Sequence, residues 1–405
     1  MKLLIMAWKN LWRSRSRTII TASAVFFAVI LSVGMTSLQE GTYQSMIDNV
    51  VKMYSGYIQV QDTSYWENKT INNTLEANDE LLNRINSTGD VSLTVPRLES
   101  FTLLSYKDKT KGAAIIGIDP EKENEMTNLS HWLHEGEYLN QNDDGLLITY
   151  NLAENLEVGI GDTLVLISQG YHGASAAGLF PVRGILKFAA PQLNNLGVYV
   201  PLLKTQEFFS AYDRLTSLIV MVDDYHLVEK TQNKLQNGLN GEYNVMSWDE
   251  MNPEIVQFID SDRQGGIVMK AILYIIIAFG ILGTVIMMIA ERHRELGVMI
   301  AVGMKKIKLV VVLFFETLFI GFLGTLAGFV VSIPIIMTFI NSPIKLPPDM
   351  AEMYELYGFE PVFVFSGDPQ IFISQVIVVF FITLGVVVYP IYTIGKMRVI
   401  NALRA

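Results

Sequence analysis

The sequence predicts an α-helical membrane protein that has four transmembrane helices and a large α+β domain carried outside the membrane on helical stalks. Half of its residues are hydrophobic and only 17% are charged, which is too apolar for an ordinary soluble protein. Four apolar runs each have at least the roughly 20 residues that a helix needs to cross a bilayer. The segment between the first two runs, residues 56–250, is polar and shows alternating strand and helix patterns.

The first long helix is predicted to run from Thr18 to Tyr54. Residues 18–38 are apolar, and the helical spacing of apolar side chains then continues without a proline. At 1.5 Å per residue such a helix is roughly 55 Å long, whereas the hydrocarbon core measures about 30 Å. We therefore expect a stalk that leaves the bilayer. The basic segment before it, residues 1–17, either lies on the membrane as an amphipathic helix or simply orients the first span.

Residues 56–250 are expected to fold as a water-soluble α+β domain. Runs such as Tyr57–Val60 and Thr163–Ile167 are rich in β-branched and aromatic residues and predict strands, while Leu227–Leu239 has helical spacing. The mixed order of strands and helices is typical of an α+β domain. The loop Gln169–Gly178 is rich in Gly and Ala and is expected to be mobile.

Three further apolar runs, residues 267–290, 309–340 and 371–395, complete the four spans. The polar lead-in before the first of them predicts a second stalk that returns to the membrane. In residues 309–340 three glycines fall near one face of the helix and are expected to permit close packing against a neighbour. These helix-packing residues are Gly321, Gly324 and Gly328.

The distribution of charge predicts which side of the membrane each segment occupies. Lys and Arg gather in residues 2–17, 292–308 and 396–404, while acidic residues crowd the segment between the first two spans. The positive-inside rule therefore puts both termini in the cytoplasm and the domain outside. The predicted segments are a cytoplasmic N-terminus 1–17, the first span with its rising stalk 18–55, the outer domain 56–250, the descending stalk with the second span 251–290, a cytoplasmic coupling helix 291–308, the third span 309–340, an outer loop 341–370, the fourth span 371–395 and a cytoplasmic tail 396–405.

The cytoplasmic segment Glu291–Lys308 reads ERHRELGVMIAVGMKKIK, with charges at both ends and an apolar middle. An ordinary positive-inside loop needs only the charge. The apolar helical middle favours a short helix that lies along the membrane face and is gripped by a partner protein. The candidate coupling residues are Glu291, Arg292, Arg294, Glu295, Gly297, Ala301 and Gly303.

Glu316 is the notable charge inside a span, about 12 Å along the helix from Lys308 at 1.5 Å per residue. An ionisable group at such a position is expensive and is a functional candidate by default. One interpretation gives it a direct part in coupling. The other gives it a structural ion pair with a cytoplasmic-side cation, namely Arg292, Arg294 or Lys305.

Several kinds of chemistry have no support in the sequence. There is no cysteine, which excludes disulfides and thiol chemistry, and the net charge of −10 argues against a nucleic-acid partner. No phosphate-binding loop G-x-x-x-x-G-K-[ST] is present, so any ATP would be hydrolysed by another chain. His131 and His134 have the spacing of metal ligands on a helix, but no third ligand is near them in the sequence. The chain is therefore expected to be non-catalytic and to bind no metal or cofactor.

At the coupling segment the chain resembles the FtsX-like and MacB-type permeases of ABC transporters, and in its layout it is most similar to the lipoprotein-releasing permeases LolC and LolE. The stretch ERHRELGVMIAVG carries this resemblance together with Glu316 in the next span. The opening AWKNLWRSRSRT, the segment LLITYNLAENLEVGIGDTLVLI and the ending YPIYTIGKMRVINALRA are also similar to the family. One departure is Met299-Ile300, which stands where relatives commonly carry an arginine.

The resemblance implies a type VII ABC permease of the bacterial inner membrane with a periplasmic domain, a second permease copy or paralogue, and two ABC ATPase subunits that hold the ATP and Mg. It implies that this chain transmits motion, with the residues of the coupling segment as contacts of the ATPase. The implied substrate is a lipoprotein drawn from the membrane lipids, favoured by the absence of a fused ATPase and by the proline-containing stretch KLPPDMAEMYELYGFEP. The alternatives are a MacB-like permease for efflux or antimicrobial-peptide resistance and an FtsX-like regulator of a cell-wall hydrolase.

Overall fold

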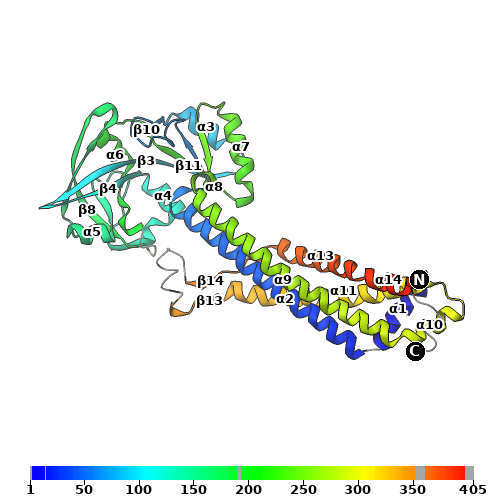
Figure 1. The fold of residues 1–405 in the computed structure, drawn as a ribbon. Helices are drawn as coiled ribbons and strands as arrows, with labels where there is room; N and C mark the ends of the chain where they lie inside the picture. The colour runs from blue at the N-terminus through cyan, green and yellow to red at the C-terminus, as the bar shows by residue number, and fades with distance from the viewer. Residues whose placement is uncertain (1, 14, 189–192, 350, 352–360, 397–405) are drawn as a thin grey trace. The chain divides into compact units, whose positions relative to one another are not determined.

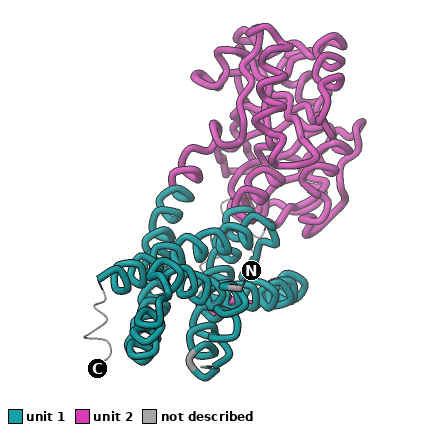
Figure 2. Tube along the Cα trace, turned by 90° about the vertical axis from the view of Figure 1, so that its right-hand side faces the viewer, with its two compact units in different colours: residues 1–44, 258–344, 362–405 teal, residues 45–257, 345–361 magenta. Residues whose placement is uncertain are grey.

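The protein is described from a computed structural model, which divides into two compact units. The helical unit comprises residues 1–44, 258–344 and 362–405, and the barrel unit comprises residues 45–257 and 345–361 (Figure 2). The structure describes residues 2–13, 15–188, 193–349, 351 and 361–396. Most of the predicted tail 396–405, and much of the stretch KLPPDMAEMYELYGFEP in the predicted loop 341–370, lie outside the described residues.

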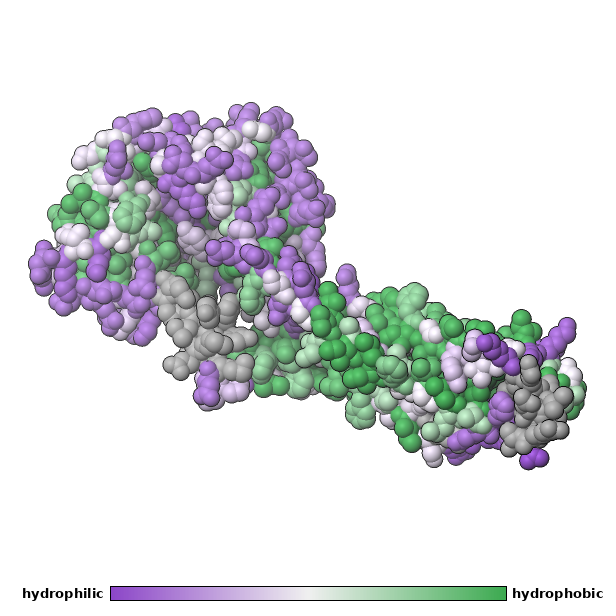
Figure 3. All heavy atoms as spheres, viewed as in Figure 1, coloured by the Kyte–Doolittle hydropathy of each residue, from purple (hydrophilic) through white to green (hydrophobic). Residues whose placement is uncertain are grey.

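Long helices build the helical unit, and short ones lie at their ends (Figure 1). Four helical stretches among the described residues are long and apolar enough to cross a membrane: Thr18–Ser55, Pro253–Glu291, Lys306–Asn341 and Pro369–Lys396. Figure 3 shows hydrophobic residues gathered over these helices. The helices are α1 (Lys2–Arg13), α2 (Arg15–Val50), α9 (Pro253–Glu291), α10 (His293–Ala301), α11 (Lys306–Asn341), α13 (Pro369–Val386) and α14 (Val388–Lys396). The four predicted spans are thus confirmed.

The first and the last of the long helices each have an irregular point. The helix that begins as α2 continues past Val50 through one π-helical turn, Val51–Ser55, so the predicted helix beyond the first span is present. The last span is divided at Val387, because Pro390 in the first turn of α14 has no N–H to bond the carbonyl four residues earlier.

The glycines of α11 lie where its neighbours come closest. A Cβ at Gly324 would lie 2.6 Å from the carbonyl oxygen of Ala22 in α2, and one at Gly328 would lie 2.9 Å from the Cβ of Val29. A Cβ at Gly321 would lie 2.6 Å from the hydroxyl of Thr383 in α13. Only glycine lets the helix backbones approach this closely without something shifting, as is common between helices in membranes.

Six strands of the barrel unit form a closed ring. β3 pairs with β4, and the ring continues through β9, β6 and β8 to β7, which pairs back onto β3. These strands are β3 (Val91–Tyr106), β4 (Lys109–Ile118), β6 (Leu146–Thr149), β7 (Thr163–Gln169), β8 (Ser175–Leu186) and β9 (Gly197–Pro201). Alternate side chains point into the ring and bury its core, which includes Leu104, Ile115, Leu166, Phe180 and Val198.

The sheet extends beyond the ring from the first half of β3, through β11 (Ser217–Val222) and β1 (Ile58–Gln61) to β12 (Asn244–Ser247). Ile58 lies opposite Ser247 in the antiparallel pair of β1 and β12. The chain therefore enters and leaves this unit at neighbouring points of one sheet.

Short elements complete the structure. The small strands are β2 (Leu75–Glu76), which pairs with β10 (Arg214–Leu215), then β5 (Leu133–Gly136), β13 (Ile344–Lys345) and β14 (Val362–Phe363). The helices of the barrel unit are α3 (Asp79–Asn86), α4 (Pro120–Thr127), α5 (Tyr150–Leu156), α6 (Leu202–Phe209), α7 (Val228–Gly238) and α8 (Trp248–Met251). The prediction of a mobile loop at Gln169–Gly178 is wrong, because β8 begins at Ser175 and only a tight turn separates it from β7.

Candidate functional site

The coupling segment contains a helix that is shorter than the predicted range 291–308. Glu291 ends α9, α10 runs from His293 to Ala301, and the last three residues of the range already belong to α11. Gly303 has a φ of +102° and its N–H donates to the carbonyl of Ile300 at 3.0 Å. This left-handed conformation favours glycine and lets the chain turn out of the helix.

Arg292 and Glu316 form the centre of the site. Nη1 of Arg292 lies 3.1 Å from each carboxylate oxygen of Glu316, and Nδ2 of Asn10 donates to Oε1 of Glu316 at 2.6 Å. The side chain of Glu316 is 1% exposed and that of Arg292 is 15% exposed. A carboxylate buried this deeply requires a paired cation and hydrogen bonds, and it has both. The pair joins the start of α10 to α11, and Asn10 connects α1 to it.

A second ion pair joins α1 to α10 at the surface. Arg13 donates to Glu295 from both terminal nitrogens, at 2.6 Å and 3.2 Å. Glu295 Oε2 also lies 3.5 Å from Nε of Arg292. Because these side chains are well exposed, the pair between Arg13 and Glu295 contributes little to stability. Its bidentate geometry nevertheless orients α1 against α10.

Beside the buried pair lies a cavity of about 20 Å³. This volume holds about one water molecule and is far too small for a substrate. The cavity is lined by Asn10, Leu11, Thr18, Thr284, Met288, Arg292, Glu316 and Ile320. The site therefore has the construction of a joint between helices and not that of a binding pocket.

The face of the coupling segment that points away from the helical unit carries exposed apolar side chains. Val298 is 44% exposed and Val302 is 84% exposed, and they are four residues apart along α10 and its C-terminal turn. Leu296 and Gly297, in contrast, are buried against the helical unit. The segment thus has one face that is packed in this chain and one apolar face that no part of the described chain covers.

The structure brings together some of the predicted site residues and separates others. Arg292, Glu295 and Glu316 lie within one cluster, and of the three cations considered for Glu316 the structure selects Arg292. Glu291, Arg294 and Ala301 are exposed outside it. Sequence reasoning missed Asn10 and Arg13 of α1. Their spacing of three residues on one helical face was the available signal.

Two other polar clusters connect the long helices of this unit. Asp262 of α9 accepts from the hydroxyl of Tyr43 at 2.6 Å and from Nε2 of Gln39 at 3.1 Å, both in α2. Gln375 of α13 accepts from Ser32 at 2.5 Å and from Tyr274 at 2.6 Å. Hydrogen bonds between helices of this kind hold membrane helices in one register.

The two histidines with ligand spacing take part in ring contacts. His131 stacks edge-on against Trp132, and His134 against Tyr150. Among the residues that the structure describes, no group of three or more His, Cys, Asp or Glu is placed to hold a metal ion.

Known families and proteins resemble this chain over most of its length. The model of the MacB-like periplasmic core domain matches residues 18–237, and the model of the FtsX-like permease C-terminal domain matches residues 267–399. An uncharacterised ABC transporter permease of Methanocaldococcus jannaschii is 21% identical over 81% of this chain and 82% of its own length. The lipoprotein-releasing system transmembrane protein LolC of Xylella fastidiosa is 23% identical over 78% of each chain.

The macrolide export ATP-binding/permease protein MacB of Acinetobacter baylyi is 20% identical over 79% of this chain, which spans 49% of that relative. Among solved structures, the periplasmic region of MacB from Actinobacillus actinomycetemcomitans is 16% identical, with 51% of this chain and 95% of that chain covered and a TM-score of 0.37. The extracellular domain of the ABC-type transporter YknZ from Gram-positive bacteria is 15% identical, with 47% and 98% covered and a TM-score of 0.34.

Proposed function

The chain belongs to the MacB/FtsX family of ABC transporter permeases, and we propose that it passes the ATP-driven motion of a separate ATPase to its periplasmic domain. The observation that carries the proposal is the buried pair of Arg292 and Glu316, which fastens the coupling segment to α11 next to an uncovered apolar face. A segment that is pushed by a partner needs both features. It needs a surface that the partner can bind and a rigid attachment to the transmembrane helix that is to be displaced.

The proposed assembly has a second permease copy or paralogue and two ABC ATPase subunits on the cytoplasmic side. ATP and Mg bind to those subunits, and this chain holds no cofactor. The distribution of Lys and Arg supports cytoplasmic termini, with the barrel unit in the periplasm and the four spans in a bacterial inner membrane.

The contacts within the helical unit supply a route for the motion. α10 is tied to α11 by the buried pair and to α1 by Arg13 and Glu295. α11 packs closely against α2 at Gly324 and Gly328. Because α2 is continuous from Arg15 to Val50, a displacement at its cytoplasmic end is carried along its length.

The coupling role is tested by the capture of the ATPase. In the full-length protein, Val302→Asp places a charge on the uncovered apolar face, and we expect the permease to lose its cognate ABC ATPase during co-purification. Leu203→Asp is the matched control, because Leu203 of α6 is exposed to 66% and lies in the barrel unit. Equal recovery of the ATPase with both variants would contradict the proposed docking face.

We propose a lipoprotein as the substrate. In support, three LolC relatives are 19–23% identical over 75–78% of this chain. Removing acyl chains from a bilayer costs about 0.8 kcal/mol per buried CH₂, so the release of a lipid-anchored protein requires the work of ATP hydrolysis.

Depletion of the protein in its host tests the substrate. We expect outer-membrane lipoproteins to remain in the inner membrane. Fractionation of the two membranes and immunoblotting for the lipoproteins measure this. Normal sorting together with a new sensitivity to macrolides or cationic peptides would instead favour a MacB-like permease for efflux or antimicrobial-peptide resistance. The similarity to MacB of Acinetobacter baylyi is the support for this alternative. Normal sorting with a defect in cell-wall hydrolysis would favour an FtsX-like regulator.

A further inference from the structure

The helix that begins as α2 ends inside the barrel unit with an unusual turn. Residues Val51–Ser55 are π-helical, and Gly56 follows with a φ of +66° and an N–H that donates to the carbonyl of Val51 at 2.8 Å. π-helical turns are rare and are often found at functional sites. The last carbonyls of any helix also lack partners within the helix and must find them elsewhere.

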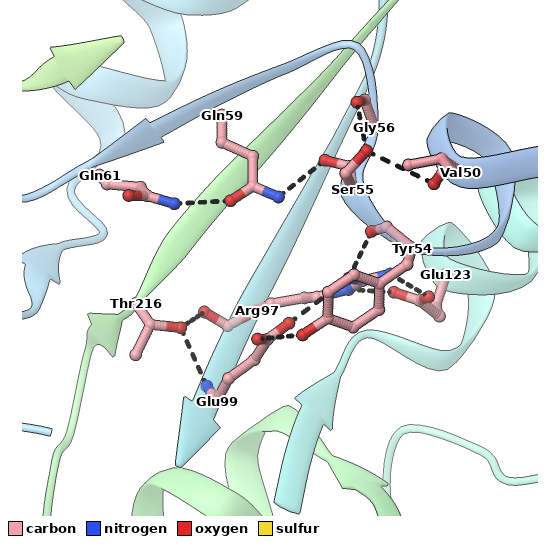
Figure 4. A network of polar contacts seen from close by, with 10 residues as sticks. All are labelled: Val50, Tyr54, Ser55, Gly56, Gln59, Gln61, Arg97, Glu99, Glu123 and Thr216. Atoms are coloured by element: carbon pink, nitrogen blue, oxygen red, sulfur yellow. Dashed lines mark hydrogen bonds and ion pairs between the residues drawn. The ribbon is translucent and has the colours of Figure 1, made fainter. Parts of the chain in front are cut away.

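Side chains of the barrel unit supply those partners (Figure 4). The carbonyl of Tyr54 accepts from Nη1 of Arg97 at 2.7 Å, and the carbonyl of Ser55 accepts from Nε2 of Gln59 at 2.7 Å. The guanidinium of Arg97 also lies over the ring of Tyr54, at 5.1 Å from its centroid. A cation at this position is further favoured by the negative end of the helix dipole.

Arg97 is in turn held by carboxylates on both sides. Its Nε and Nη2 bond the two carboxylate oxygens of Glu123 in α4, at 2.9 Å and 2.6 Å, and both side chains are 1% exposed. Glu99 lies 3.4 Å from Nη1 and accepts from the hydroxyl of Tyr54 at 2.7 Å. Burial opposes the charge on Arg97, but the carboxylate of Glu123 outweighs it and raises the pKa of the guanidinium above its usual value.

Such a buried pair is a poor means of gaining stability. Apolar residues of similar volume are often as stabilising as a buried ion pair, because both ions lose their hydration. What the pair adds is a single geometry, since a bidentate guanidinium–carboxylate contact fixes both distance and angle. Its presence at the end of a long helix therefore indicates a requirement for position.

We propose that Arg97 is a positioning residue that fastens the last turn of the α2 helix to β3 and α4, so that the barrel unit follows this helix instead of swivelling at Gly56. Without the clamp, formed by Tyr54, Arg97, Glu99 and Glu123, the junction at Gly56 would be the weakest point of the connection. This inference rests on the proposed function, in which α2 carries the motion. The clamp itself can be measured without that function.

The chain has no cysteine, so spin labels can be placed at will. Gln44→Cys on α2 and Glu229→Cys on α7 are exposed positions for a pair of labels in the full-length protein in nanodiscs. The clamp is removed by Arg97→Met with Glu123→Leu, which leaves neither of the two fully buried charges unpaired, while Glu99, 22% exposed, keeps its hydrogen bond from the hydroxyl of Tyr54. The matched control is Arg84→Met with Glu242→Leu, because Arg84 and Glu242 form an ion pair of 3.2 Å at the surface of the same unit.

We expect the distance distribution between the labels to be narrow in the wild type and in the control, and to broaden when the clamp is removed, with the circular dichroism spectrum unchanged. A distribution as narrow as that of the wild type would overturn the proposal. If the double variant does not fold, Arg97→Lys decides, because it keeps the charge but loses the bidentate contact and is also expected to broaden the distribution. A narrow distribution for Arg97→Lys would then overturn the proposal.

The same clamp variants, labelled at Glu229→Cys alone and reconstituted with the ATPase, separate this inference from the proposed function. In the wild type we expect ATP to shift the distance between labels placed on the two barrel units of a dimer, and in the clamp variant we expect this shift to be lost while ATP hydrolysis continues. No shift in the wild type would count against the proposed function alone. A full shift in the clamp variant would count against the clamp.

Discussion

Arg292 and Glu316 are 24 residues apart in the chain, yet Nη1 of the arginine lies 3.1 Å from both oxygens of a carboxylate that is 1% exposed. The pair ties the N-terminal end of α10 to α11 and fastens the coupling segment to the helical unit. A surface loop held only by exposed charges would give way under load, since exposed ion pairs contribute roughly 0–1 kcal/mol.

Replacing Glu316 with Gln is expected to lower the free energy of unfolding by about 3–5 kcal/mol, because the change removes the buried carboxylate that pairs with Arg292 and leaves that guanidinium only the more exposed Glu295. Thermal unfolding of the purified protein in nanodiscs measures this. Glu242→Gln is the control, since it removes an ion pair of 3.2 Å to Arg84 at the surface of the barrel unit, and its effect is expected to stay below about 1 kcal/mol. Equal and small effects of the two variants, with ATPase binding retained, would remove Glu316 from both a structural and a coupling role.

Replacing Gly324 with Ala is expected to separate α11 from α2. The added Cβ would lie 2.6 Å from the carbonyl oxygen of Ala22, and overpacking of this kind costs about 1–3 kcal/mol. Gly280→Ala is the matched control on α9, where no described atom beyond the neighbouring backbone of the same helix lies within 4 Å of the new Cβ. Unfolding in nanodiscs should distinguish the two, and an equally stable Gly324→Ala variant would contradict the close contact.

Replacing Gly56 with Ala is expected to destabilise the barrel unit by about 1–3 kcal/mol from backbone strain alone, because a φ of +66° with a ψ of 176° is nearly confined to glycine. The new Cβ would also lie 2.1 Å from Cγ2 of Ile219. Gly238→Ala provides the comparison, since it has open space and an ordinary φ. The measurement is chemical unfolding of the full chain, followed by the near-ultraviolet signal of the tyrosines, and comparable midpoints would refute the expectation.

Ionisation of Tyr57 is expected to lower the free energy of unfolding at alkaline pH. Burial, and then the nearby carboxylates of Asp48 and Asp224, raise the pKa of its phenol from 10.0 to about 12. Since the folded state favours the neutral form, this contribution is complete below pH 10 and is lost as the pH rises through about 12. Tyr57→Phe cannot ionise and should therefore lose less stability over this range than the wild type does. Identical pH dependence of unfolding in the two proteins would show that the environment of Tyr57 does not shift its titration.

The apolar runs and their helical spacing were sufficient to predict the four spans and the continuation of the first helix beyond the hydrocarbon. Both are local properties of consecutive residues, and no distant part of the chain was needed to recognise them. The strand patterns likewise predicted an α+β domain. They could not predict that β7 pairs with both β8 and β3 and so closes a ring, because strand pairing joins segments far apart in the sequence.

Some of the buried polar contacts could be predicted from the sequence and others could not. Glu316 was conspicuous because a carboxylate in an apolar run needs a partner, and Arg292 was one of three cations within reach. Asn10 carried only the weaker signal of its spacing from Arg13, and Arg97 stands among ordinary strand residues, so that each acquires its role only from an element elsewhere in the chain. Hydrophobic pattern thus determined where the chain crosses the membrane, while the choice of partner for each buried charge was decided by the three-dimensional packing that desolvates it.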